Sequence, residues 1–283
     1  MCRFTFYMGQ EIRVASLITE PENSLIHQSF DSLEREEPLN GDGFGLAWYA
    51  PDHVEPALFK SVTPAWSNRN LRDLARVVSS RCVMGHVRAA TQQLEVSESN
   101  CHPFRRGRHL FMHNGDIGGF DVLRRPMLSA LSDRAFRAIT GTTDSEHFFG
   151  LLMDSIRELD VHQVDTLAEA LMRTLRRVLD LSADHGVEDP TYLNAVITDG
   201  ERAVACRFTT DVPENADSLY VASGRAYTCV EGASTFVDAD GDRGSVLVSS
   251  ERLSDDDGWM SVPVNHMVLV AADLSAKVMP MEV

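Results

Sequence analysis

Short stretches in which apolar and polar positions alternate occur in both the first and the last third of the chain, and such alternation predicts β-strands. The predicted strands are Arg3–Met8, Gly45–Tyr49, Ala57–Ser61, Val83–Arg88, His109–His113, Tyr192–Thr198, Ala203–Phe208, Leu219–Ala222, Ser245–Ser249 and His266–Ala271. Apolar positions three and four residues apart predict helices at Asn70–Ser79, Glu146–Leu159 and Val164–Leu181. This order favours layers of mixed strands and helices over a repeating βαβ sheet.

Composition places the chain among ordinary globular proteins, with 43% hydrophobic and 24% charged residues in a length of 283. No segment has the character of a linker, so we predict a single domain over 2–283. Residues 2–150 carry the motifs described below, and 151–283 supply a helical block and a second set of strands. The 26 basic and 42 acidic residues give a net charge of −16. This excess of acid argues against binding to nucleic acid or to an anionic membrane.

The sequence also predicts a cytoplasmic protein without a metal or other cofactor. Its longest apolar stretches, such as Val264–Leu274, are well short of the roughly 20 residues that a membrane-spanning helix requires. Its five cysteines include no C-x-x-C pair, which argues against a disulfide framework or a zinc ribbon. A zinc site built from Cys101, His102 and other histidines is an alternative, but no recognised ligand spacing supports it.

Cys2 carries the most chemical information. Because its side chain is small, we expect removal of the initiator methionine, which would leave a thiol and a free α-amino group on one residue. The reference pKa of an α-amino group is about 7.7–8.0 and that of a thiol about 8.5, so a proton can pass between them near neutral pH. The amine can then act as general base without a histidine. The alternative is an incidental cysteine on the first strand.

Two downstream motifs contain side chains that could bind a substrate. Arg88 ends an apolar strand in Gly85–Thr91, where its guanidinium group could hold a carboxylate through two parallel hydrogen bonds or could form a structural ion pair. Asn114 and Gly115 follow another apolar strand. An asparagine amide and the next backbone N–H can point together at a developing oxyanion, although Asn-Gly is also a common hairpin turn.

A third motif, Thr142–Glu146, precedes a predicted helix. Asp144 could bind a substrate ammonium group, or Asp144 or Ser145 could cap the helix. His86 and His113 lie within the two earlier motifs. We interpret them as core histidines that are hydrogen-bonded to the backbone rather than as a catalytic pair.

In this order the motifs resemble those of the class II glutamine amidotransferases, which are N-terminal-nucleophile hydrolases. The family pattern is an N-terminal cysteine, His-x-Arg at a strand end, His-Asn-Gly, and Thr-Asp-x-Glu. The resemblance is denser to the branch that includes the amidotransferase subunit of the yeast glutathione-degradation complex and related stand-alone γ-glutamyl amidohydrolases. The segments that carry it include Met1–Phe4, Ile26–Ser32, Asn40–Gly45, Thr63–Trp66, Ser97–Phe104 and Val248–Glu251.

The resemblance implies an α+β fold, a four-layer αββα sandwich, and a set of residue roles. Cys2 would be the nucleophile and its α-amino group the base. The Asn114 side chain and the Gly115 N–H would form the oxyanion hole. Arg88 would bind the α-carboxylate of a glutamyl group, and Asp144 its α-ammonium. The implied reaction is hydrolysis of a γ-glutamyl amide bond through a thioester on Cys2.

Several alternatives remain open at this stage. The chain could be a glutaminase subunit that delivers ammonia to a separate synthase, a non-catalytic γ-glutamyl-binding scaffold, or a zinc amidohydrolase. A separate peptidase-like or synthase subunit is the expected partner. Asn40–Gly43 replaces the Arg-Gly-Tyr-Asp type of motif of the sugar-synthesising relatives, and Ala89 replaces a tryptophan. Residues 92–100 could form a lid over the substrate or an ordinary surface loop.

Overall fold

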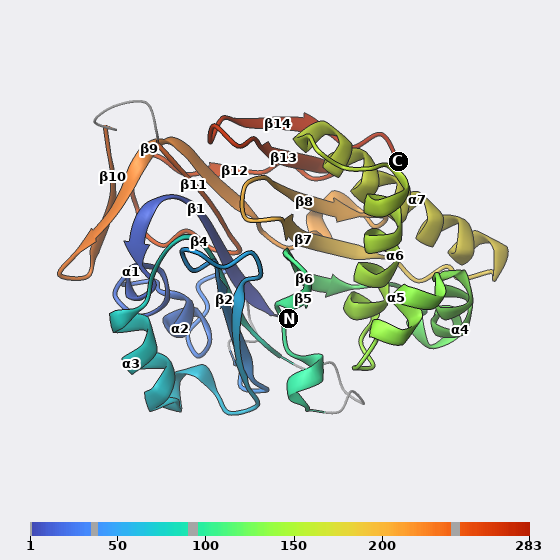
Figure 1. Ribbon diagram of the computed structural model, residues 1–283, viewed down its shortest axis with the longest axis horizontal. Coiled ribbons are helices and arrows are strands. Elements are labelled where there is room, and N and C mark those ends of the chain that lie inside the picture. The colour runs from blue at the N-terminus through green and yellow to red at the C-terminus, as the bar shows by residue number, and fades with distance from the viewer. Residues whose placement is uncertain (1, 35–38, 90–95, 239–243) are drawn as a thin grey trace.

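Two β-sheets stack face to face, and helices cover the outer side of each sheet (Figure 1). The computed structural model describes residues 2–34, 39–89, 96–238 and 244–283. In the first sheet the order is β10 (Ala233–Val237), β9 (Tyr220–Val230), β11 (Ser245–Ser249), β1 (Arg3–Arg13), β4 (Ser79–Val87), β2 (Phe44–Trp48) and β3 (Ala57–Ser61), with β12 (Met260–Ser261) also paired to β9. In the second it is β14 (Ala276–Pro280), β13 (His266–Val270), β8 (Ala203–Thr209), β7 (Tyr192–Thr198), β6 (His109–Asp116) and β5 (Phe104–Arg106).

Two groups of helices form the outer layers. The first sheet is covered by α1 (Ala15–Ile18), α2 (Leu25–Gln28) and α3 (Arg69–Val77). The second is covered by α4 (Phe120–Ala130), α5 (Asp133–Ala138), α6 (Asp144–Glu158) and α7 (Val164–Asp184). Single 3₁₀ turns are η1 (Ala65–Ser67), η2 (Glu98–Asn100) and η3 (Pro213–Asn215). Within the described ranges, no helix combines the length and the apolar character needed to cross a bilayer.

Three apolar layers hold these four layers together. Buried side chains from facing strands of the two sheets form the central layer, as at Phe6 and Met112. A second layer joins the first sheet to its helices, as at Leu46 and Leu71. A third joins the second sheet to α6 and α7 and includes Phe111. The predicted four-layer αββα sandwich is therefore confirmed.

Strand β1 shows why the central strands have such an apolar sequence. Side chains alternate between the two faces of a strand. Phe4, Phe6 and Met8 accordingly face the second sheet, whereas Tyr7 belongs to the layer under the helices. Both faces are buried near the start of β1, which favours apolar side chains at successive positions there.

Each predicted strand and helix is present, but β1, β4 and β9 are each longer than predicted by several residues. The structure also adds elements that the pattern did not predict. The additional strands are β5, β10, β12 and β14, and the additional helices are α1, α2, α4 and α5. Helix α4 contains Pro126, which removes a backbone donor and obscures the helical pattern. The predicted helix cap, Asp144 or Ser145, was wrong: Thr143 is the N-cap of α6, and its side chain accepts from the Glu146 N–H at 3.2 Å.

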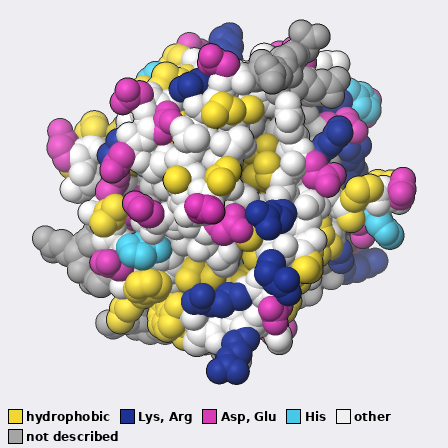
Figure 2. Space-filling view, turned by 90° about the vertical axis from the view of Figure 1, so that its left-hand side faces the viewer, with side chains coloured by type: hydrophobic (Ala, Val, Ile, Leu, Met, Phe, Trp, Pro, Cys, Tyr) yellow, Lys and Arg dark blue, Asp and Glu magenta, His cyan; other side chains and the backbone are white. Residues whose placement is uncertain are grey.

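Charged side chains are spread over the molecular surface. On the face shown in Figure 2, acidic and basic side chains both occur across the surface, with hydrophobic side chains between them. Both sheets also combine strands from residues 2–150 with strands from the rest of the chain. Strands from residues 151–283 therefore lie in the same sheets as the strands that carry the motifs of residues 2–150.

Candidate active site

Cys2 lies directly before β1, next to the end of β4. Because Arg3 pairs with Val87 in the antiparallel register, Cys2 lies opposite Arg88. The Cys2 thiol donates to the carbonyl oxygen of Ala89 at 3.6 Å. Burial raises the pKa of the Cys2 thiol, and the hydrogen bond to Ala89 and the positive charges of Arg88 and Arg3 offset this only in part. The thiol is therefore protonated at neutral pH until a base accepts its proton.

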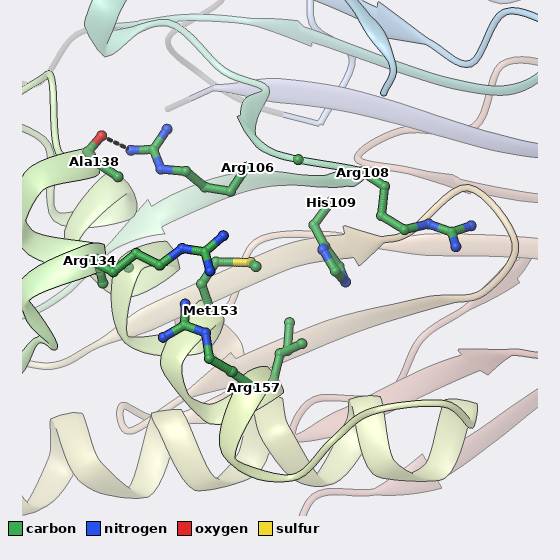
Figure 3. A pocket seen from close by; sticks show the side chains of 11 residues that line it. Arg106, Arg108, His109, Arg134, Ala138, Met153 and Arg157 are labelled. Carbon is green, nitrogen blue, oxygen red and sulfur yellow. Dashed lines mark hydrogen bonds between the residues drawn. The ribbon is translucent and has the colours of Figure 1, made fainter. Parts of the chain in front are cut away.

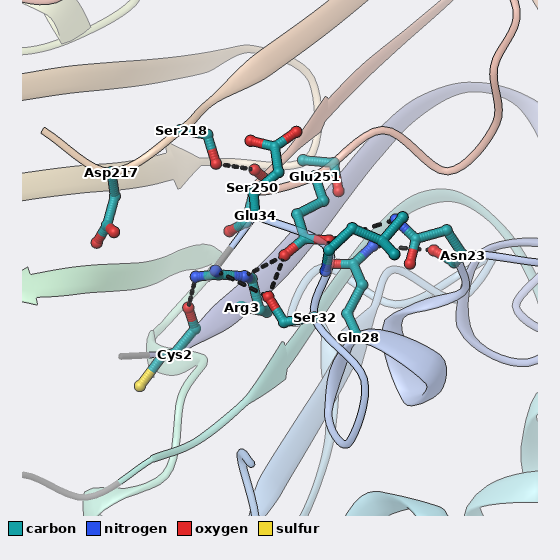
Figure 4. Close-up of polar contacts among 12 residues, drawn as sticks. Cys2, Arg3, Asn23, Gln28, Ser32, Glu34, Asp217, Ser218, Ser250 and Glu251 are labelled. Atoms are coloured by element: carbon teal, nitrogen blue, oxygen red, sulfur yellow. Dashed lines mark hydrogen bonds and ion pairs between the residues drawn. The ribbon is translucent and has the colours of Figure 1, made fainter. Parts of the chain in front are cut away.

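The Arg3 side chain is hydrogen-bonded to the backbone of Cys2 (Figure 4). Its Nη1 donates to the Cys2 carbonyl oxygen at 3.0 Å, and its Nη2 donates to the Ser32 hydroxyl at 3.0 Å. Its Nε pairs with Oε1 of Glu251 at 2.8 Å, and both side chains are only 1% exposed. The Ser32 hydroxyl and the Leu33 N–H also donate to the Glu251 carboxylate. This group, which we call the Arg3 cluster, fixes the residue that carries the thiol.

The carboxylate of the Arg3 cluster is ionised despite its burial. Burial alone would raise the pKa of Glu251, but hydrogen bonds from Ser32 and Arg3 and the charge of Arg3 outweigh it and lower that pKa. Sequence reasoning assigned no role to Arg3 or Glu251. The available signal was an arginine next to Cys2 and an acid just after an apolar strand.

Arg88 has a different environment from Arg3. Its side chain is 3% exposed, and among the described residues its Nη1 is buried without a hydrogen-bond partner. Its backbone is held on both sides, since its N–H donates to the Gly43 carbonyl at 2.9 Å and its carbonyl accepts from the Asp42 N–H at 3.0 Å. A fixed, buried cationic donor without a partner is suited to binding an anion.

Asn114 and Gly115 end β6 in the second sheet. The Asn114 Nδ2 donates to Oδ2 of Asp217 at 3.3 Å, which orients the carboxamide and leaves its second N–H for another acceptor. Gly115 has φ +132, and a Cβ there would lie 2.1 Å from the Tyr192 carbonyl oxygen. Only glycine fits this position. Asp217 is a further orienting residue that sequence reasoning did not identify.

Asp144 does not cap its helix but connects two motifs. Its Oδ2 accepts from the Ile117 N–H at 2.8 Å, just after β6, and its Oδ1 accepts from the Ser145 N–H at 2.7 Å. The carboxylate is 9% exposed and is held in one orientation. It is thus placed near the end of the strand that carries Asn114.

Two histidines bring the predicted site residues together. His86, two positions before Arg88, bonds through Nε2 to the His113 carbonyl oxygen at 3.1 Å. His113, next to Asn114, bonds through Nδ1 to the Ser145 hydroxyl at 2.9 Å and through Nε2 to the Tyr192 carbonyl at 3.0 Å. Burial lowers the pKa of His86 to about 3, so that ring is neutral. The interpretation of both as core histidines is confirmed, and together they link the three motifs.

Cys101 and His102 do not form the alternative zinc site. The Cys101 thiol contacts the carbonyl oxygens of Ser97 and Ser61 at 3.5 and 3.8 Å. The His102 ring lies 4.3 Å from the ring of His86, measured between centroids. Across the part of the chain that the structure describes, no three His, Cys, Asp or Glu side chains are grouped to hold a metal ion.

The predicted lid is described only at one end. Residues 92–95 lie outside the described ranges, and Glu98–Asn100 form η2. The Asn100 side chain is paired twice with Thr142, accepting from its N–H at 2.8 Å and donating to its hydroxyl at 3.0 Å. This end of the segment is attached to the loop that precedes Asp144.

An aromatic pair lies beside the loop that holds Arg88. Phe30 and Trp66 meet edge to face with centroids 6.2 Å apart, and Phe30 is 41% exposed. A Cβ on Gly41 would lie 3.1 Å from the Trp66 ring, one position before the Asp42 that bonds Arg88. Apolar surface is therefore available next to the glutamyl-binding residues of the predicted site.

A cysteine at a strand start, a buried arginine opposite it, and an Asn-Gly pair in the facing sheet define a class of protein. The chain belongs to the class II glutamine amidotransferases, since a family model described as "Glutamine amidotransferases class-II" matches residues 16–280. It is 37% identical to the probable glutamine amidotransferase DUG3 of Saccharomyces cerevisiae, over 95% of this chain and 82% of that protein. The predicted family is thereby confirmed.

More distant relatives extend the comparison. The chain is 26% identical to the gamma-glutamyl-hercynylcysteine sulfoxide hydrolase of Mycobacterium tuberculosis, over 95% of this chain and 93% of that protein. A class II domain protein from Silicibacter pomeroyi superposes over 100% of both chains with a TM-score of 0.67 and 28% identity. The Bacillus subtilis glutamine phosphoribosylpyrophosphate amidotransferase matches with a TM-score of 0.62 and 15% identity, over 99% of this chain but 49% of its own. That last likeness supports the N-terminal-nucleophile hydrolase fold alone.

Proposed function

We propose that this protein hydrolyses a γ-glutamyl amide bond, with Cys2 as nucleophile. The observation that supports the proposal is the hydrogen-bonded link from His86 through His113 to Ser145. These three residues are near neighbours in the sequence of Arg88, Asn114 and Asp144, and Arg88 lies opposite Cys2 in the register of β1 and β4. A γ-glutamyl headgroup has one carboxylate and one ammonium on the same carbon. Arg88 and Asp144 supply the complementary charges, and each charge-assisted bond contributes about 1.5–3 kcal/mol.

The reaction follows from the properties of Cys2. The α-amino group accepts the thiol proton, and sulfur attacks the γ-carbonyl carbon. The Asn114 amide and the Gly115 N–H stabilise the negative oxygen of the tetrahedral intermediate. The C–N bond then breaks as the α-ammonium returns its proton to the leaving amine, which gives a thioester. Water, deprotonated by the same amine, cleaves the thioester to release glutamate and restore the thiol.

The relatives support the reaction class and leave two candidates for what is released. The mycobacterial protein is named as a γ-glutamyl hydrolase, and this favours direct hydrolysis of a conjugate. The yeast protein is named as a glutamine amidotransferase, and this favours a second candidate in which ammonia from glutamine passes to a separate synthase subunit. A separate peptidase-like subunit is the predicted partner for the first candidate, since the motifs account only for binding of the glutamyl end.

Release of glutamate tests the proposal. Purified protein is incubated with glutathione, glutamine and γ-glutamyl dipeptides, and glutamate is quantified against the Cys2→Ala variant. We expect release by the native protein and a loss of turnover below detection in Cys2→Ala, with an unchanged unfolding midpoint. Faster turnover of dipeptides or glutathione favours hydrolysis, and preference for glutamine favours ammonia delivery.

Intact-mass measurement makes the result decisive. A retained Met1 blocks the α-amino group and removes the proposed base, so the assay uses protein whose mass shows an N-terminal Cys2. Glutamate release that persists in Cys2→Ala would contradict the proposal. So would a processed protein that binds γ-glutamyl compounds and turns none of them over, which is the expectation for a non-catalytic scaffold.

A further inference from the structure

A second cavity lies at the opposite end of β6 from Asn114. Its volume is about 540 Å³, and it is lined by residues near the β5–β6 turn and by residues of α5 and α6, including His109 and Met153 (Figure 3). From His109 to Asn114 the strand rises roughly 17 Å, so this cavity is separate from the Cys2 site. Small-molecule sites usually measure about 300–1,000 Å³. Nothing described above for the reaction at Cys2 uses this cavity.

Four arginines line the cavity, although the chain as a whole has a net charge of −16. The four are Arg106, Arg108, Arg134 and Arg157. Its other lining side chains include no acid. Its remaining walls are largely apolar, with Met153 and Ile156 of α6 among them.

Three of these arginines have carboxylate partners outside the lining, and the fourth has none. Arg106 pairs with the buried Glu146 at 2.7 Å and bonds the Ala138 carbonyl. Arg108 pairs with Glu201 at 3.0 Å. Arg157 pairs with Asp154 at 3.2 Å. Arg134 has no ion pair or hydrogen bond with any described residue, so the lining keeps an excess of positive charge.

Arg134 of α5 and Arg157 of α6 both line the cavity, together with Met153 (Figure 3). Two guanidinium groups in one cavity repel each other, and of the two only Arg157 pairs with a described carboxylate, that of Asp154. An anion between them would replace repulsion by attraction. A guanidinium group can also bind a sulfonate, phosphate or carboxylate through two parallel hydrogen bonds.

We propose that this cavity binds a small organic anion that has an apolar body. The anionic group is held by Arg134 and Arg157, and the apolar body lies against Met153 and Ile156. Inorganic anions lack the body and would bind more weakly. The inference does not depend on the reaction proposed for Cys2.

The dye 8-anilinonaphthalene-1-sulfonate has this chemistry and serves as the probe. Its fluorescence is titrated with the native protein and with a double variant, Arg134→Gln with Arg157→Gln. A matched double variant, Arg124→Gln with Arg125→Gln, changes net charge equally at exposed positions on α4 outside the cavity lining. The neutral analogue N-phenyl-1-naphthylamine tests the need for the anionic group.

We expect one saturable class of sites and at least a tenfold rise in Kd for the sulfonate in the cavity double variant. The α4 variant and the neutral dye should show no comparable change. Equal sulfonate affinity in the two double variants would overturn the proposal, as would equal loss of the neutral dye in the cavity variant. If the double variant fails to fold, Arg134→Gln alone is used, because Arg134 has no partner to lose among the described residues.

Discussion

Arg3 and Arg88 lie close together at the paired ends of β1 and β4, but their guanidinium groups have different electrostatic environments. All three guanidinium nitrogens of Arg3 have partners, and one of these is the carboxylate of Glu251. Arg88 is buried to a similar degree, yet its Nη1 has no partner among the described residues. Removing a partner from a buried, paired charge destabilises the fold, whereas a buried charge with an unpaired donor can bind an anionic ligand. Burial alone does not separate these two roles.

Removal of Glu251 should have the largest effect on stability. In Glu251→Ala the guanidinium of Arg3 stays buried without its counter-ion, and breaking a buried pair in this way costs about 3–5 kcal/mol. Urea denaturation measures the free energy of unfolding. Glu158→Ala, which removes an exposed pair with Arg173, is the control and should change it by less than about 1 kcal/mol. Equal effects in the two variants would show that the Arg3 cluster does not support the fold.

Asn114→Ala should have the next largest effect, and on catalysis rather than stability. Loss of one oxyanion donor lowers kcat about 10²- to 10³-fold. The ground-state contacts of Arg88 and Asp144 remain, so KM should change little. Steady-state glutamate release measures both constants. A rise in KM with kcat unchanged would mean that Asn114 binds substrate instead of stabilising the intermediate.

Arg88→Gln should weaken substrate binding without lowering the free energy of unfolding, which is the opposite of the effect expected for Glu251→Ala. The substrate loses a charge-assisted bond of about 1.5–3 kcal/mol, so KM should rise about tenfold to a hundredfold. The free energy of unfolding should stay constant or increase, because a buried charge with an unmet bond is removed. Denaturation and steady-state kinetics on the same preparation measure both. A stability loss as large as that of Glu251→Ala would place Arg88 in the same structural class as Arg3.

The pH dependence of stability should show the smallest effect and should be specific to the Arg3 cluster. The pKa of Glu251 is lower in the folded protein than its ordinary value, despite burial, because of the bonds from Ser32 and Arg3. Its contribution is therefore complete above that ordinary value and is lost as pH falls through the folded pKa. Denaturation of native protein and Glu251→Gln at a series of pH values should give a difference that is constant near neutrality. The difference in unfolding free energy should become smaller below about pH 4. A difference that becomes larger there would contradict a lowered pKa for Glu251.

The sequence predicted the strands with two buried faces but only one, β3, of the four strands at the ends of the two sheets. Strand β1 is apolar at successive positions because both of its faces are covered, whereas β5, β10 and β14 are edge strands with exposed positions. An edge strand needs less apolar sequence, so its pattern is weaker.

The site residues also fall into two groups, those that the sequence predicted and those that it did not. The residues that lie in short motifs, such as Arg88 and Asn114, could be identified from the chain itself. Asp217 and Glu251 could not, because they reach the site through contacts with residues 103 and 248 positions away. Such contacts depend on the register of strands across a whole sheet, which local patterns do not encode.

The separation of Arg3 from Glu251 also has a consequence for biosynthesis. At about 5–20 residues per second, the ribosome adds Glu251 roughly 12 to 50 seconds after Arg3. Throughout that interval Arg3 lacks its counter-ion, Glu251, and β1 lacks the adjoining strand β11. Until then, Cys2 lacks the fixed position that Arg3 and Glu251 together give it in the folded protein. Cys2 is therefore translated long before the acid and the strand that hold its neighbourhood in place.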